Sequence, residues 1–264
     1  PLRHGAKYMR GLGWMKVRKG DRALITGASY GIGEAFAREL AARDVDLVLV
    51  ARTETRLRTL AGELSNVECT VLPCDLRLGT PSLEDIGRID VLVNNAGFGL
   101  FGPFEEQHPE WVSGMIELNV RALVELARAV APQMVQRRRG GIINVGSMAS
   151  IMVLPYMAEY SASKAFVLTF SQALHAEYAR RGVTVTALLP GMTSTRFASI
   201  SHTPDNLGPR QTARQVAHTG LKALEAGRPT AVSGWFNVLG AAAIKLTPRM
   251  IFARLWALSQ APNA

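Results

Sequence analysis

The sequence has very few cysteines, with only Cys69 and Cys74 among 264 residues. Two cysteines cannot make the disulfide framework of a small secreted protein, and they are too few for a cysteine-rich metal site. Small thiols beside a predicted strand are common core residues. We therefore expect free thiols in a reducing compartment and no bound metal.

Long hydrophobic runs are also missing. The most apolar stretch, residues 231–246, is interrupted by Asn237 and Lys245 and falls short of the roughly 20 residues that a membrane span needs. The N-terminus lacks the apolar core of a signal peptide. These absences predict a cytoplasmic protein without a membrane-spanning helix.

Acidic residues are outnumbered, 21 against 30 lysines and arginines, for a net charge of +9. A basic excess can indicate a nucleic-acid partner, but its position matters more than its size. Residues 1–22 hold seven basic residues and one acidic residue, so the rest of the chain carries only +3. We expect a solvated basic arm over residues 1–20, a nearly neutral body and no nucleic-acid partner.

What the chain does contain is a regular alternation of aliphatic runs and helical patterns. Strands are predicted at 22–26, 46–50, 67–72, 89–94, 141–147, 183–190 and 230–234, and helices at 33–43, 54–64, 108–138, 161–180 and 212–226. Continuous apolar strands joined by helices are typical of a parallel sheet buried on both faces. Right-handed connections then predict a doubly wound α/β fold with seven strands, as one domain over 21–232. The short interval between Asp75 and Asn94 predicts a helix reduced to a turn.

The segment ITGASYGIGEAFAREL, residues 25–40, places Gly27, Gly31 and Gly33 between the first strand and the first helix. A helix N-terminus offers unpaired N–H groups to phosphate oxygens, and glycine lets the backbone approach closely. The segment therefore favours a Rossmann-type dinucleotide site. Alone it is weak, because the spacing differs from the general fingerprint and a glycine-rich turn without a ligand looks the same.

Further motifs follow in order: CDL at 74–76, NNAG at 94–97, Ser147, YSASK at 160–164 and PG at 190–191. Together with TGASYGIG at 26–33 they resemble the short-chain dehydrogenase/reductase family, over about residues 20–232. The resemblance implies an oxidoreductase of the NADP-preferring carbonyl or 3-oxoacyl reductase type. It also implies a catalytic set of Asn119, Ser147, Tyr160 and Lys164.

Elementary chemistry agrees with the proposed catalytic set. Tyr160 and Lys164 are one helical turn apart, so their side chains share a face. A phenol has a pKa of ~10, and we expect the lysine ammonium to lower it. By resemblance, Ser147 and Tyr160 bind the substrate carbonyl while the nicotinamide delivers hydride, Tyr160 then protonates the alkoxide, Lys164 holds the ribose, and Asn119 anchors a water relay. Taken singly, each residue has an ordinary alternative as a cap, a surface pair or a kink residue.

The end of the second strand predicts the type of cofactor. An acidic residue there would bind the ribose hydroxyls of NAD, but this chain has Ala51 and Arg52, with Arg56 close behind. A guanidinium pairs with phosphate, so we predict NADP(H); the alternative is that Arg52 is a solvated strand-end charge. Tyr30 departs from many NADP-preferring relatives, which carry a basic residue there. The predicted cofactor-binding residues are Gly27, Ser29, Tyr30, Gly31, Ile32, Gly33, Arg52, Asp75, Leu76, Asn95, Ala96, Gly97, Tyr160, Lys164, Pro190, Gly191, Thr193 and Thr195.

Three segments, 98–104, 148–157 and 192–203, are rich in Met, Phe, Leu and Ile and carry few charges. They predict an apolar pocket for a small hydrophobic carbonyl substrate, with residues 192–210 as a closing lid. The predicted lining residues are Phe98, Met148, Tyr156, Met192 and Phe197. The leading hypothesis is an NADPH-dependent reductase of hydrophobic ketones. The alternatives are a 3-oxoacyl-thioester reductase acting on a carrier protein or CoA and, more distantly, a catalytically silent nucleotide-binding regulator.

The C-terminal extension, residues 233–264, combines Lys245, Arg249 and Arg254 with many apolar residues. Such an amphipathic segment can lie on a membrane surface, cover the substrate pocket or pack against a second subunit. The family resemblance further implies a homodimer or homotetramer built on helices 108–138 and 161–180.

Overall fold

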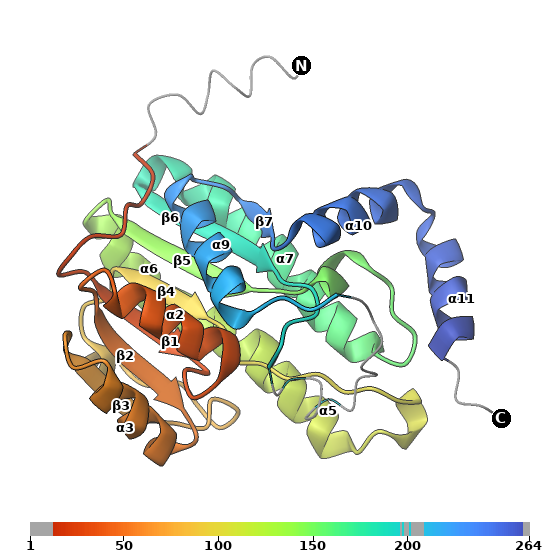
Figure 1. The fold of residues 1–264 in the computed structure, drawn as a ribbon, viewed down its shortest axis with the longest axis horizontal. Helices are drawn as coiled ribbons and strands as arrows, with labels where there is room; N and C mark the ends of the chain where they lie inside the picture. The colour runs from red at the N-terminus through yellow and green to blue at the C-terminus, as the bar shows by residue number, and fades with distance from the viewer. Residues whose placement is uncertain (1–12, 196, 198–200, 202–208, 261–264) are drawn as a thin grey trace.

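A computed structural model describes residues 13–195, 197, 201 and 209–260 of the chain. It contains one seven-stranded sheet in the order β3-β2-β1-β4-β5-β6-β7, and every neighbouring pair is parallel (Figure 1). The strands are β1 (Arg22–Thr26), β2 (Asp46–Ala51), β3 (Cys69–Pro73), β4 (Val91–Asn94), β5 (Gly140–Val145), β6 (Val183–Leu189) and β7 (Thr230–Val232). The predicted doubly wound, seven-stranded parallel sheet is confirmed.

Helices cover both faces of the sheet (Figure 1). One core packs the sheet against α2 (Gly31–Ala41), α3 (Glu54–Glu63) and α9 (Ala213–Glu225). The other packs it against α4 (Leu83–Ile86), α6 (Leu123–Gln136) and α7 (Ala158–Tyr178). The strands of the central sheet are buried on both sides, which explains why their sequences are continuously apolar rather than alternating.

Two helical regions differ in detail from a simple pattern. The region expected to shrink between Asp75 and Asn94 does so, because α4 has only four residues. The region 108–138 consists of α5 (Pro109–Ile116), a π-helical turn η2 (Glu117–Ala122) and α6. A π-turn inside a long helix is a frequent mark of a functional site, and this one contains Asn119.

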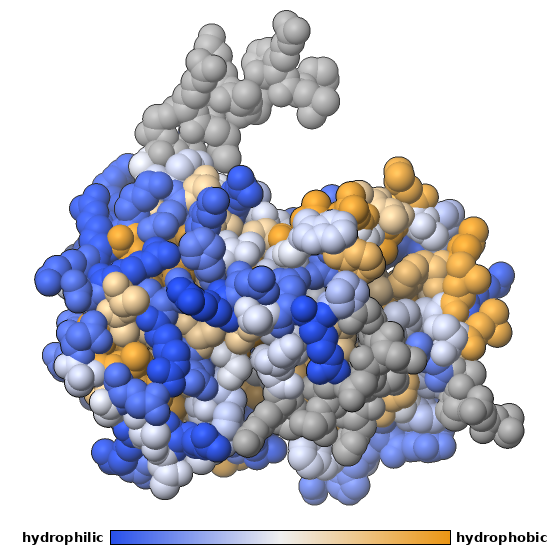
Figure 2. Space-filling model, viewed as in Figure 1, coloured by the Kyte–Doolittle hydropathy of each residue, from blue (hydrophilic) through white to orange (hydrophobic). Residues whose placement is uncertain are grey.

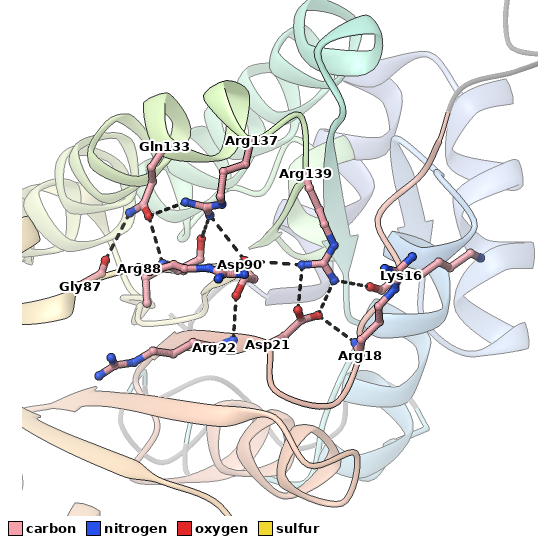
Figure 3. Close-up of polar contacts among 11 residues, drawn as sticks. Lys16, Arg18, Asp21, Arg22, Gly87, Arg88, Asp90, Gln133, Arg137 and Arg139 are labelled. Atoms are coloured by element: carbon pink, nitrogen blue, oxygen red, sulfur yellow. Dashed lines mark hydrogen bonds and ion pairs between the residues drawn. The ribbon is translucent and has the colours of Figure 1, made fainter.

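The amino-terminal edge of the sheet is held by buried carboxylates and arginines (Figure 3). Both carboxylate oxygens of Asp21 accept hydrogen bonds of 2.8 Å from Arg139. Asp90, only 1% exposed, accepts hydrogen bonds from the Arg22 backbone N–H and from the Arg88 guanidinium. This network lies at the ends of the strands opposite to those that carry the predicted site, so we read it as structural.

Part of the predicted basic arm packs against the body of the protein. Residues 1–12 lie outside the described residues, but Met15 is 2% exposed and belongs to the core. Its backbone N–H donates to Thr184 Oγ1 at 3.0 Å, and Trp14 stacks on His175. The expectation of a solvated arm is therefore wrong for Trp14 and Met15, because these apolar side chains pack against the rest of the protein.

The C-terminal extension forms two helices, α10 (Trp235–Leu246) and α11 (Arg249–Gln260), that project from the β7 side of the sheet (Figure 1). Trp256 Nε1 of α11 donates a hydrogen bond of 3.2 Å to the carbonyl of Pro155. None of the helices in the described part of the chain combines the length and the hydrophobicity that a membrane span requires.

Candidate active site

The predicted phosphate loop lies at the carboxyl end of β1 and opens directly into α2. Gly27 and Gly31 have φ angles of +66° and +60°, which favour glycine, and a Cβ on Gly33 would stand 2.2 Å from the Gly27 carbonyl oxygen. A Cβ on Gly31 would approach Thr195 Cγ2 at 2.8 Å. The loop is therefore a backbone cradle at a helix N-terminus, and the fold brings Thr195 to it from a distant part of the chain.

Thr26 is a site residue that the sequence reasoning missed. Its hydroxyl oxygen accepts hydrogen bonds of 2.9 Å from the backbone N–H groups of Asn95 and Ala96. The Asn95 side chain donates in return to the carbonyls of Thr26 and Gly27. These bonds join the NNAG segment to the phosphate loop. The threonine of the TGASYGIG motif was the available signal.

Other predicted cofactor residues surround this loop in different ways. Ile32 packs against the core on one side of the sheet, and Leu76, only 3% exposed, lies in the core on the other. Only the backbone of Leu76 is then well placed to meet a ligand. Gly97 lies where a Cβ would contact Asn119 Oδ1 and Lys164 Nζ. Ser29 lies in the turn between β1 and α2.

Basic side chains lie beside the loop, at the carboxyl end of β2 and on α3. The Arg56 guanidinium lies 4.7 Å above the ring of Tyr30, so α3 supplies a positive charge at the position where the sequence lacks one. Arg52 and Arg56 are both exposed, so a ligand phosphate could reach their guanidinium groups. Asp75 is held by Arg77 at 2.6 Å, and this bond, with a smaller contribution from Arg52, lowers the pKa of the Asp75 carboxyl.

Ser147 and Tyr160 meet at the carboxyl end of β5. Ser147 caps a short 3₁₀ turn, η3 (Met148–Ile151), where its Oγ accepts a hydrogen bond from the Ala149 N–H at 3.1 Å. Burial of Tyr160 raises its pKa to about 12, while a hydrogen bond from Ser147 acts in the opposite direction. The cap and the contact with Tyr160 coexist, so the ordinary reading of Ser147 does not exclude the catalytic one.

Lys164 lies one turn after Tyr160 on α7, with its Nζ 5.9 Å from the tyrosine ring centre. The ammonium is 5% exposed and donates to the Val145 carbonyl at 3.0 Å, and burial lowers its pKa to about 8. We expected Lys164 to lower the pKa of Tyr160, but burial of the phenol raises it, and the opposing contribution comes from Ser147. At neutral pH Tyr160 is therefore a protonated acid beside a largely protonated lysine.

Asn119 is 1% exposed in the π-turn η2. Its side chain accepts from the Phe98 N–H at 3.1 Å, donates to the Phe98 carbonyl at 2.9 Å, and donates to Ser163 Oγ at 3.1 Å. The amide thus ties the segment after β4 to α7, next to Gly97 and Lys164. All four predicted catalytic residues lie on segments that converge at this edge of the sheet.

An apolar cluster forms one wall of the site, with Tyr160 among its members. The ring of Phe197 lies 5.5 Å from that of Tyr160, and a Cβ on Gly99 would touch both rings. The cluster contains Phe98, Leu100, Phe101, Met115, Ala149, Met152, Leu154, Met157, Tyr160, Phe197, Phe252 and Trp256.

Some of the predicted pocket residues belong to this cluster and others do not. Phe98 and Phe197 belong to the cluster, and the ring centre of Tyr156 lies 6.3 Å from that of Phe101, a member of the cluster. Met148 and Met192 are not among its members; the Met148 N–H donates to the Pro190 carbonyl and the Met192 carbonyl accepts from Gln211. Covering of the pocket was one of the roles expected for the C-terminal extension, but its contributing residues, Phe252 and Trp256, were not named, since nothing local in the sequence links α11 to Pro155.

The segment after PG begins at the same edge. Gly191 packs on the Asn237 side chain, and Thr193 forms a bridge with Gln211. Most of the predicted lid, residues 196, 198–200 and 202–208, lies outside the described residues. Within the described ranges, no cluster of His, Cys, Asp or Glu is suited to a metal ion.

Comparison with known proteins agrees with this geometry. The family model of the short chain dehydrogenases matches residues 21–205. The chain belongs to the short-chain dehydrogenase family. Its members are oxidoreductases, so the family resemblance of the motifs and the predicted enzyme class are confirmed. The solved structure of a short-chain dehydrogenase from Sphingobium yanoikuyae in complex with NADPH is 34% identical, with a TM-score of 0.78 over 92% of this chain and 98% of that one.

Other similar proteins indicate two substrate classes, 3-oxoacyl-CoA thioesters and bulky ketones. A very-long-chain 3-oxoacyl-CoA reductase from Anas platyrhynchos is 34% identical over 83% of this chain and 76% of that protein. Matches to the rat and mouse reductases of that name cover only 62% of their length. The bulky-bulky ketone specific alcohol dehydrogenase from Comamonas testosteroni is 31% identical, with a TM-score of 0.70 over 92% of this chain and 97% of that one.

Proposed function

We propose that this protein uses NADPH to reduce the 3-oxo group of 3-oxoacyl-CoA thioesters that carry long acyl chains. The observation that carries the proposal is the position of Tyr160, a buried acid that forms part of an apolar wall with Leu154, Met157 and Phe197. A carbonyl beside the phenol would have its hydrocarbon chain against these side chains. The similarity to very-long-chain 3-oxoacyl-CoA reductases supports this substrate class.

The proposed cofactor fits the residues present. The three glycines leave room for a pyrophosphate at the N-terminus of α2, and Arg52 and Arg56 offer guanidinium groups for a 2′-phosphate. The similarity to a dehydrogenase solved with NADPH supports the same choice. When bound, NADPH would supply the hydride that reduces the carbonyl carbon.

The protein's own residues would act on the carbonyl oxygen. The Ser147 hydroxyl lies close enough to the Tyr160 phenol to lower its pKa, so both hydroxyls could donate to one carbonyl oxygen placed beside them. As negative charge develops there, Tyr160 would donate its proton, and its pKa of about 12 keeps that proton in place at neutral pH. Lys164, with a pKa of about 8, would stabilise the phenolate that remains. Asn119 would hold the Phe98 segment against α7.

A second candidate is reduction of bulky hydrophobic ketones, which the sequence alone ranked first. The apolar wall and the similarity to the bulky-ketone alcohol dehydrogenase favour it. We rank it below the thioester because very-long-chain 3-oxoacyl-CoA reductases from several animals are 34% identical to this chain, against 31% for the bulky-ketone alcohol dehydrogenase. Both candidates use the same catalytic residues and differ in what the pocket must hold.

A substrate panel followed by NADPH absorbance separates the two. Acetoacetyl-CoA, 3-oxohexadecanoyl-CoA, and cyclic and aromatic ketones would be compared by kcat/KM. Each methylene buried in the pocket is worth about 0.8 kcal/mol, so we expect a rise of about fourfold per added methylene until the pocket is full. Faster turnover of the ketones would select the second candidate. No reduction of any carbonyl despite NADPH binding would select the silent regulator.

We further propose a cytoplasmic homodimer or homotetramer. Phe166 is 41% exposed on α7 and stacks on Phe170, which leaves an aromatic surface on one of the two helices expected to pair. Cys69 and Cys74 are both free, which suits a reducing compartment. Light scattering should give a multiple of the 28.6 kDa chain mass, and Phe166→Glu should reduce it. A monomer in the unaltered protein would contradict the proposal.

A further inference from the structure

The C-terminal helices carry most of the large hydrophobic side chains that the described structure exposes. Figure 2 shows hydrophobic residues gathered over α10 and α11, on a face that is otherwise largely hydrophilic. Nine such side chains, each at least 50% exposed, define what we call the α10–α11 face: Trp235, Phe236, Val238, Leu239, Leu246, Met250, Ile251, Leu255 and Leu258. Patches of this kind mark interaction surfaces.

The helical spacing shows that these residues face away from the protein. Trp235, Leu239 and Leu246 lie four and seven residues apart, on one side of α10, while Ala241 is buried on the other side. On α11, Leu255 and Leu258 point outward, whereas Phe252 and Trp256 pack into the apolar cluster of the active site. The outward-facing apolar side chains of α10 and α11 therefore take no part in the core of this chain.

Charge indicates what covers this face. The sequence has no aspartate or glutamate after Glu225, and the α10–α11 region adds Lys245, Arg249 and Arg254, all exposed. Two copies paired through this face would bring cations together with no acid between them. An anionic surface would pair with all three cations.

Length limits how the helices can meet a bilayer. A helix of 12 residues rises about 18 Å, against a hydrocarbon core of about 30 Å, so neither helix can cross it. Short helices with an apolar stripe and flanking lysines and arginines lie in the plane of the interface instead.

We propose that the α10–α11 face docks on the surface of an anionic lipid bilayer. Because the other side of α11 forms part of the active-site wall, docking places the apolar cluster around Tyr160 beside the lipid. This consequence rests on the proposed function: long acyl chains partition into lipid and would reach the pocket without crossing water. The docking itself does not depend on the substrate.

The test is co-sedimentation of the full chain with vesicles of phosphatidylcholine alone or mixed with phosphatidylglycerol, without substrate. We expect binding to the mixed vesicles that weakens as salt rises. Each cation contributes about fivefold, so Lys245→Glu, Arg249→Glu and Arg254→Glu together should reduce partitioning by at least a hundredfold. The pair Leu239→Ser and Leu255→Ser should also abolish binding. Leu78→Ser, at a site 88% exposed but far in sequence from these helices, is the matched control and should bind normally.

Two further measurements keep the outcomes distinct. Circular dichroism must show that each variant is folded, and light scattering must show an unchanged molar mass. Failure of the unaltered protein to bind mixed vesicles, or undiminished binding by both sets of variants, would overturn the proposal. So would a smaller molar mass in the Leu239→Ser and Leu255→Ser variant, because the face would then join subunits. Failure of the proposed function would appear separately, as vesicle binding without thioester reduction.

Discussion

Selection of NADPH over NADH is expected to depend on Arg52, and the change Arg52→Asp tests this directly. The guanidinium lies at the end of β2, close enough to Asp75 to contribute to the lowered pKa of that carboxyl. Hydrogen bonds to charged groups contribute about 1.5–3 kcal/mol. Since Arg52 is exposed, we take the lower limit, about 1.5 kcal/mol, which corresponds to roughly a tenfold loss in kcat/KM for NADPH.

The introduced carboxylate adds repulsion. A unit charge about 5 Å from a doubly charged phosphate in water costs about 1.7 kcal/mol by Coulomb's law. The two effects together predict that Arg52→Asp lowers kcat/KM for NADPH about two-hundredfold. NADH lacks the 2′-phosphate, so its kcat/KM should change little. Arg56→Ala should have a smaller effect in the same direction, because Arg56 already stacks on Tyr30.

Steady-state kinetics with both cofactors and one carbonyl substrate measure these changes. Arg58→Asp is the matched control, because Arg58 lies on the same helix as Arg56 but pairs with Glu54 and is 67% exposed. It introduces the same charge change near the site and should leave the selectivity within about twofold, the difference expected of a screened surface charge. Unchanged NADPH selectivity in Arg52→Asp, or an equal loss in Arg58→Asp, would refute the assignment.

Three further predictions follow from the site and the core. Tyr160→Phe should lower kcat by about a hundredfold or more while NADPH still binds, as followed by cofactor fluorescence; near-normal turnover would exclude Tyr160 as the acid. Carbonyl reduction should decline as pH rises through about 8, where Lys164 loses its proton, and Lys164→Arg should remove that decline in a kcat–pH profile. Asp90→Asn should reduce the free energy of unfolding by about 3 kcal/mol in urea titrations, because three arginines lose a buried carboxylate; a change below 1 kcal/mol would contradict a structural role.

Much of the fold was determined by local sequence pattern. Continuous aliphatic runs such as those of β2 and β6 have one stable environment, the interior of a parallel sheet, and their order along the chain sets the connections. Motif spacing also predicted that Tyr160 and Lys164 share a helix face, because that is a property of one helical turn. The seven strands and the carboxyl-edge location of Ser147 required no information beyond the sequence.

Contacts between distant segments required the tertiary structure. The charge that Tyr30 lacks comes from Arg56 on another helix, and α11 reaches the active-site wall through Trp256 and Pro155, 101 residues apart. The pKa of Tyr160 also could not be predicted from the sequence, because it depends mainly on the burial of the phenol in the packed site and not on the spacing to Lys164. The local sequence pattern determines whether a segment is a helix or a strand and which of its side chains share a face. Burial and the distances between charges arise only when the segments pack together. They determine the pKa of Tyr160, and they determine which apolar side chains of α10 and α11 stay exposed and can contact another surface.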